Sequence, residues 1–246
     1  MYKSLYDISW QVSEPEYRQD SALSYSTIAK FDREGFNNLK HLRDRVETPS
    51  LFFGSAVDAI ITGSIDEFNK LFMVADIKCP SDTLVTICKR LYRDYGSLYI
   101  SITDIPDDLM LESITDINWN NYWRPSTRAS KIKEECAEYY RLLFRANGRT
   151  IMDSKTFNDV CACVDALKST PATKFYFEEN NPFDNTIERF YQLKFKGNLD
   201  GIDYRCMADL IIANHKEKVV YPIDLKTSSK PEWDFYKSFV EWGYEK

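Results

Sequence analysis

Residues 204–229 read YRCMADLIIANHKEKVVYPIDLKTSS, two runs rich in β-branched residues on either side of a polar turn. Each run carries an aspartate, Asp209 in the first and Asp224 at the end of the second, and Lys226 follows Asp224 after one residue. Side chains two apart in a strand share a face, so Asp224 and Lys226 are expected to project together. The turn at residues 214–218 brings Asp209 beside them. Charged groups on an otherwise apolar hairpin are costly to bury unless a metal ion compensates them, so the hairpin predicts a metal site.

Alternation with a period of two begins near residue 186 and predicts three consecutive strands. The expected strands are Thr186–Lys196, Ile202–Ile212 and Val219–Lys226. Glu188 and Gln192 share a face of the first strand, and no role follows for Gln192 from the pattern alone. Helices are expected before this meander and one after it. That order is typical of an α/β or α+β protein with one mixed central sheet, flanking helices and a helical N-terminal part.

The expected helices come from stripes of apolar residues and from capping signals. Residues 1–20 are expected to be a loosely structured lead-in. Ser24 or Ser26 is a candidate N-cap, and the small residues Gly54, Ser55 and Ala56 would let another part of the chain approach closely. The expected helices begin near Ser24, run from Thr48–Pro49–Ser50 to Gly63, and cover Lys131–Asn147, Ser154–Ser169 and Glu232–Trp242.

The composition is that of a folded protein, because 43% of the 246 residues are hydrophobic and 15% are aromatic. No apolar run approaches the roughly 18 residues of a membrane span, and the N-terminus lacks the apolar stretch of a secretory signal. The six cysteines match neither a zinc-site spacing nor a disulfide framework, which indicates reduced thiols. We therefore expect a cytoplasmic protein with no membrane partner.

The net charge of −6 argues against nucleic acid as a partner. Electrostatics at a groove is local, however, and residues 124–155 carry eight Lys/Arg against four Asp/Glu. This basic bias indicates either a solvated helix face or part of a DNA groove. Arg205 has two similar interpretations, a contact with DNA phosphate or a salt bridge at a strand edge. His41 and His215 are both expected at the surface.

Several segments together resemble the PD-(D/E)xK nuclease superfamily, and most of all its RecE/RecB-like, exodeoxyribonuclease VIII-like exonucleases of phages and bacteria. The likeness covers about residues 21–75 and 186–240. It is carried by Leu23–Ser26, Leu51–Asp58, Phe68–Val74, Met207–Ile211 and Ile223–Thr227.

The resemblance implies a restriction-endonuclease-like fold and a magnesium site, with manganese as the alternative ion. Asp58, Asp209, Asp224 and the Leu225 carbonyl would be the metal ligands, and Asp209, Asp224, Lys226 and Glu188 the catalytic residues. Asp58 stands where the family has a histidine, and oxygen ligands suit both hard cations. The alternatives are a helix-face aspartate at position 58 and an exposed strand carboxylate at position 188.

Two features of that family are missing from the sequence. No Gln-x-x-x-Tyr motif follows the Asp-x-Lys triplet, so residues 21–246 are expected to be a nuclease-like domain that is incomplete at its C-terminus. No cysteine follows Cys206, so no iron–sulfur cluster is expected.

The expected function is a metal-dependent DNA exonuclease that hydrolyses phosphodiester bonds at duplex DNA ends, for recombination, replication or repair. The resemblance places it in bacterial or phage-infected cytoplasm, as a homo-oligomer, with a single-strand annealing protein as partner. One alternative is an endonuclease or the nuclease module of a helicase–nuclease complex. The other is a catalytically idle protein that binds DNA ends or a partner.

Overall fold

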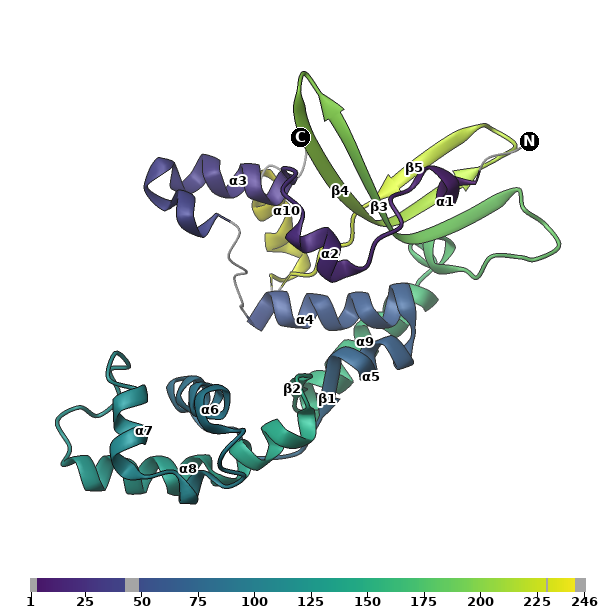
Figure 1. The fold of residues 1–246 in the computed structure, drawn as a ribbon. Coiled ribbons are helices and arrows are strands. Elements are labelled where there is room, and N and C mark those ends of the chain that lie inside the picture. Colours follow the sequence, from purple (N-terminus) through teal and green to yellow (C-terminus); the bar gives the residue numbers. More distant parts are fainter. Residues whose placement is uncertain (1–3, 43–48, 229, 242–246) are drawn as a thin grey trace. The chain divides into compact units, whose positions relative to one another are not determined.

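The structure, a computed structural model, describes residues 4–42, 49–228 and 230–241. It is a mixed α/β fold, mostly helical, with two separate small sheets (Figure 1). The chain divides into two compact units, one formed by Met1–Glu67 with Val160–Lys246 and the other by Phe68–Asp159. In the described part of the chain, no helix has the length and apolar character needed to cross a lipid bilayer.

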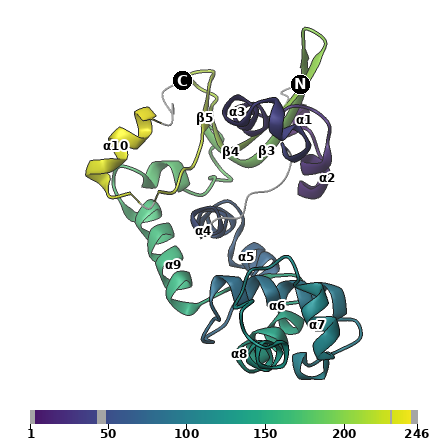
Figure 2. The same ribbon diagram turned by 90° about the vertical axis from the view of Figure 1, so that its left-hand side faces the viewer.

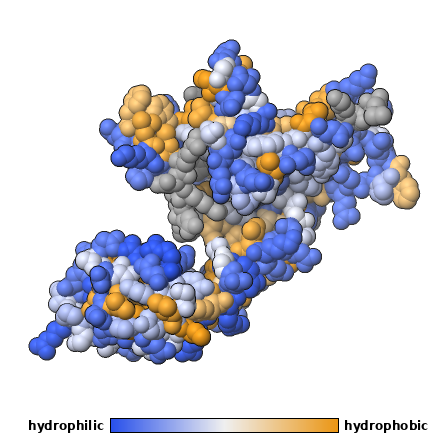
Figure 3. All heavy atoms as spheres, in the orientation of Figure 1, coloured by the Kyte–Doolittle hydropathy of each residue, from blue (hydrophilic) through white to orange (hydrophobic). Residues whose placement is uncertain are grey.

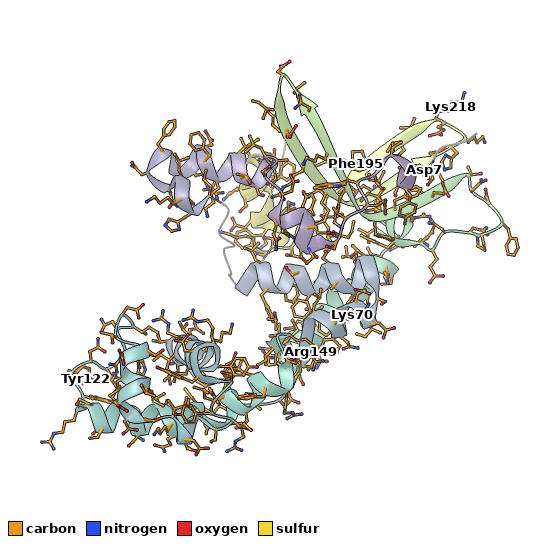
Figure 4. All side chains as sticks on the ribbon, viewed as in Figure 1. Asp7, Lys70, Tyr122, Arg149, Phe195 and Lys218 are labelled. Carbon is orange, nitrogen blue, oxygen red and sulfur yellow. The ribbon has the colours of Figure 1, made fainter. Side chains whose placement is uncertain are left out.

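The first unit is organised by an antiparallel sheet in the order β3-β4-β5 (Figure 1). β3 spans Ile187–Leu199, β4 spans Ile202–Asn214 and β5 spans Val219–Ile223. The long β3–β4 hairpin closes at Asp200 and Gly201, both with positive φ, as a tight hairpin turn requires. The sheet has a small buried cluster of Phe190, Leu193, Ile211 and Ala213, and Phe195, labelled in Figure 4, packs against it.

One residue interrupts the ladder between β3 and β4. Tyr191 pairs with Leu210 and Leu193 pairs with Ala208, whereas Gln192 between them has a left-handed φ of 54°. The register is the same on both sides of the interruption, so no residue has been inserted. Residues an odd number apart in a regular strand face opposite sides, yet Phe190 and Leu193, three apart, join the same buried cluster. Ala208 and Ile211 of β4, also three apart, pack in the same cluster, so side chains from both strands gather there around the interruption.

Short capped helices precede the sheet in the first unit. Ser4 with Asp7 and Ser13 with Glu16 form capping boxes, so the expected lead-in contains ordered helices. Ser24 caps the next helix by accepting from the Thr27 N–H, as the sequence indicates. The helical elements of this unit are α1 (Leu5–Ile8), α2 (Glu14–Gln19), α3 (Tyr25–Glu34), η1 (Phe36–His41), α4 (Pro49–Asp58), η2 (Ala59–Gly63), η4 (Lys174–Phe177) and α10 (Glu232–Glu241).

The α3–η1 segment contains no buried residue. Tyr25, Ile28, Phe36 and Leu39 are all exposed, and Figure 3 shows apolar residues gathered on this segment. The described residues thus leave an apolar helical face open to solvent.

The second unit is a helical core with a short parallel ladder. Leu91, Ile132 and Tyr140 are fully buried among its helices, and Figure 2 shows α8 nearly end-on beside α6 and α7. Its elements are β1 (Phe72–Val74), α6 (Asp82–Tyr95), η3 (Ile102–Asp104), α7 (Asp107–Ser113), α8 (Pro125–Ala146) and β2 (Thr150–Met152). Two helices, α5 (Ile65–Leu71) and α9 (Ser154–Ser169), continue across the boundaries between the units in sequence.

The mixed α/β class is confirmed, but one mixed central sheet is not seen in the part of the chain described. The parallel ladder β1-β2 and the antiparallel sheet β3-β4-β5 are separate, because β1 and β2 pair only with each other through three residues each. The third strand is shorter than expected and ends at Ile223. Asp224 and Lys226 therefore lie in the irregular segment after β5 and not within a strand. Thr48 and Trp242, expected at helix ends, fall outside the described residues.

Candidate functional site

Three polar residues occupy one level across the antiparallel sheet. Gln192 stands opposite Asp209 at the interruption between β3 and β4. On the other side of β4, Leu210 pairs with Ile223, the last residue of β5. The next residue, Asp224, therefore lies level with Asp209. Directly opposed residues in an antiparallel sheet are close neighbours. The register thus aligns Gln192, Asp209 and Asp224, which we call the polar row.

Asp209 lies at the centre of the polar row and is half-buried. Its Oδ2 accepts a hydrogen bond from the Leu225 N–H at 2.8 Å. Burial raises the pKa of Asp209 above its ordinary value; the bond from Leu225 lowers it, and the nearby Asp224 carboxylate raises it again. Leu225 enters the site through its N–H, and a ligand role for its carbonyl stays a prediction.

Asp58 reaches the row from a helix distant in sequence. It is the last residue of α4, and the chain continues into the π-helical turn η2, where the Ser64 N–H bonds the Ala59 carbonyl. The Gln192 Nε2 donates to both carboxylate oxygens of Asp58, at 3.0 and 2.9 Å. The sequence assigned no role to Gln192, and nothing in its residue type signals the left-handed conformation, which favours Gly, Asn and Asp.

Burial, and next the charge of Asp209, raise the pKa of Asp58 to about 6. The bond from Gln192 opposes this increase in the pKa. Of two neighbouring carboxyl groups, the one that loses its proton last must do so beside the negative charge of the other, and its pKa is therefore raised. Here that group is Asp58. Two partly buried carboxylates thus influence each other, and a neutral amide is the bonded partner of one of them.

Lys226 forms an ion pair with Asp224, and both side chains are exposed. The two side chains thus project together, as the sequence predicts, although both residues lie beyond the end of β5. Beside them α4 runs close to the chain, since a Cβ at Gly54 would lie 2.7 Å from the Thr227 Oγ1. The expected close approach at the small residues of this helix is thus confirmed at Gly54.

An open pocket of about 420 Å³ adjoins the Asp224–Lys226 segment. Phe235 and Phe239 of α10 line its apolar side, and Asp224 and Lys226 line its polar side. The site therefore has room beside the ion pair for a small polar or amphipathic group.

Glu188 is not brought into the polar row. It lies four residues before Gln192 on β3, roughly 13 Å along a strand. Its Oε2 lies 2.5 Å from the His215 Nε2. His215 is half-buried, so its expected exposed position in the turn is wrong. His41 is exposed, as expected.

Two basic features lie apart from the row. The Arg205 guanidinium stacks over the Tyr17 ring at 4.8 Å, and its Nε and Nη1 are buried without a hydrogen-bond partner among the described residues. The charge of Arg205 helps to lower the pKa of Asp20, and its contact with DNA phosphate stays a prediction. The basic bias of residues 124–155 belongs mostly to α8 of the second unit, where its Lys131 and Lys133 form ion pairs with Glu134 and Asp107.

The chemistry of the carboxylates fits a hard divalent cation. Within the described ranges, no three metal-ligating side chains converge tightly enough as they stand to hold an ion. The charge of Asp209 nevertheless raises the pKa of Asp58, and the charge of Asp224 raises the pKa of Asp209. Asp58 is bonded to the Gln192 amide, and Asp224 is paired with the Lys226 ammonium. Carboxylate oxygens are the ligands that Mg²⁺ and Mn²⁺ prefer, and a cation would offset the repulsion. Asp58 and Asp224 would have to move closer to Asp209 to hold one with it.

Comparison with known proteins found no family model, no curated relative and no solved structure that matches this chain.

Proposed function

We propose that the chain is a Mg²⁺-dependent DNA exonuclease of the PD-(D/E)xK type, with Mn²⁺ as the alternative ion. The observation that supports it is the alignment of Asp209 with Asp224, which pairs with Lys226, and the electrostatic interaction of Asp58 with Asp209. Three carboxylates and one ammonium are what metal-assisted phosphodiester hydrolysis needs. A restriction-endonuclease-like fold, a homo-oligomer and an annealing-protein partner belong to the same proposal and rest on the sequence resemblance.

In this proposal Asp209, Asp224 and Asp58 would hold the cation through their carboxylate oxygens, and the Leu225 carbonyl would be a further ligand. When bound, the cation supplies a more acidic water and a Lewis acid for the phosphate. The Leu225 N–H keeps the Asp209 carboxylate oriented. Glu188 stays outside this site, because it is paired with His215 at the far part of the strand.

Lys226 acts on the substrate once its partner changes. The ammonium pairs with Asp224, and it would be free for the substrate once the Asp224 carboxylate served as a metal ligand. It can then donate to a phosphate oxygen or orient the attacking water, where charge develops in the transition state. The adjoining pocket leaves space for the nucleotide that carries this phosphate.

Release of nucleotides from linear duplex DNA tests the proposal. We expect release with Mg²⁺ and none with a chelator. Asp224→Ala should reduce the rate at least about 100-fold. Loss of a hydrogen-bond partner of a metal ligand typically costs up to about 100-fold, and loss of a ligand should cost at least as much. Asp165→Ala, on the exposed face of α9, is the matched control and should leave the rate unchanged. Equal rates in the wild type and Asp224→Ala would remove the assigned site.

Closed circular duplex separates the nearest alternative, since an exonuclease cannot begin without an end. Cleavage of that substrate would favour an endonuclease or the nuclease module of a larger complex. Binding of DNA ends without binding of Mg²⁺ or Mn²⁺ would favour the idle binding protein.

A further inference from the structure

Two local irregularities of the backbone meet in one hydrogen-bonded pair. Gln192 has a left-handed φ of 54° inside a thirteen-residue strand, and Asp58 stands where α4 changes into the π-helical turn η2. The partners are 134 positions apart in sequence, and the Gln192 carboxamide donates to both oxygens of Asp58. Left-handed backbone at residues other than glycine and π-helical turns are both uncommon, and both cluster at functional sites.

The fold of the sheet does not require the left-handed residue. The β3–β4 register is identical before and after Gln192, so a regular strand would pair the same residues. Leu193, the next residue, is buried in the cluster of the sheet, whereas the Gln192 side chain bonds Asp58 instead. A strained conformation persists when the surroundings over-determine it, and here the identified partner of the Gln192 side chain is Asp58.

The carboxamide suits the task of holding a carboxylate near another carboxylate. Asp58 and Asp209 repel each other, and a neutral amide offsets this without bringing a charge. An ammonium in the same place would compete with a metal cation for the carboxylate. Each oxygen of a carboxylate has two lone pairs, so an amide bond leaves capacity for a cation on the same oxygen.

We propose that Gln192 is a positioning residue that holds Asp58 beside Asp209 and so prepares the oxygen ligands for a hard divalent cation. This rests on the proposed function, because it deepens the same site. The partners of metal ligands typically change metal affinity by about 10–100-fold when they are removed.

Cation binding by calorimetry, with Mn²⁺ and with Mg²⁺ as probes, tests the role of Gln192. Gln192→Gly removes the carboxamide, and glycine adopts a positive φ without strain, so the fold is retained. We expect its affinity for the cation to fall by about 10–100-fold. Lys218→Gly is the matched control: Lys218 also has a positive φ, of 57°, and lies in the β4–β5 turn away from the row (Figure 4). Its affinity should equal that of the wild type.

Asp58→Asn, alone and with Gln192→Gly, shows whether the effect passes through Asp58. We expect Gln192→Gly to cause little further loss once Asp58 is replaced, because residues that act as a unit are not additive. Thermal unfolding in a chelator, a readout without any cation, should show the same coupling between the two positions.

The outcomes separate the two proposals. Equal affinities of the wild type and Gln192→Gly, or fully additive losses, would overturn the positioning role alone. A wild-type chain that binds neither cation would overturn the proposed function, and the positioning role with it.

Discussion

Replacement of the Asp58 carboxylate by an amide should make the cation-free protein more stable at neutral pH. The folded state raises the pKa of Asp58 from 3.8 to about 6, so the native chain binds this proton more tightly than the unfolded chain does. The corresponding stability is fully present below pH 3.8 and is lost as the pH rises through about 6. At about 1.36 kcal/mol per pH unit, the difference amounts to about 3 kcal/mol at most.

Two effects reduce the gain expected from Asp58→Asn at pH 7.5. Asp58 is partly exposed, which screens the repulsion, and an asparagine accepts fewer of the bonds from Gln192, at a cost of about 1 kcal/mol. We expect a net gain of about 1–2 kcal/mol. This corresponds to a rise in Tm of about 2–8 °C for a chain of this size.

Thermal unfolding in a chelator between pH 4 and 8 measures this effect. The wild type should lose stability from pH 4 to pH 7, and Asp58→Asn should lose less; some dependence remains because burial also raises the pKa of Asp209. Asp32→Asn, an exposed carboxylate of α3, is the control and should follow the wild-type curve. If Asp58→Asn is less stable than the wild type by the same amount at every pH, the carboxylate is not under electrostatic stress and the reasoning fails.

Further predictions concern the surroundings of the row. Gly54→Ala should destabilise the protein by up to about 2 kcal/mol in chemical denaturation. Overpacking against Thr227 costs about 1–3 kcal/mol, and the higher helix propensity of alanine offsets about 1 kcal/mol of this. Adding Thr227→Ala should restore stability. Lys226→Met should tighten Mn²⁺ binding in calorimetry, because it removes the ammonium that competes for Asp224. DNA hydrolysis should fall by about 100-fold or more. Weaker Mn²⁺ binding would refute the idea that Lys226 and the cation compete for Asp224. Glu188→Gln should leave Mn²⁺ affinity within about twofold, because Glu188 contacts His215, and a loss of affinity would bring it back into the site.

Much of the secondary structure follows from local patterns. The three strands were predictable from their alternation, and α9 from its apolar stripe, which matches Ser154–Ser169. The start of α8 at Pro125 was missed, although proline at the first helical turn is a known signal. The separation into two sheets could not be predicted, because the three-residue strands β1 and β2 pair across a long stretch of sequence.

The candidate site was predictable in its acidic residues and less so in its geometry. Asp209 acts electrostatically on Asp58, and Asp224 acts on Asp209, while their role as metal ligands stays a prediction. The contact between Gln192 and Asp58 depends on a left-handed residue and a π-helical turn, and neither has a signature in the residues concerned. The pairing of Glu188 with His215 depends on how far β4 extends beyond its expected end at Ile212.

Cation binding to the central aspartate is the most direct measurement. Calorimetric titration of the chelator-treated protein with Mn²⁺ at pH 7.5 should show about one site, with affinity reduced at least about 100-fold in Asp209→Asn. A wild-type chain that takes up no Mn²⁺, or an Asp209→Asn variant that binds it equally well, would contradict the claim that these carboxylates share one cation.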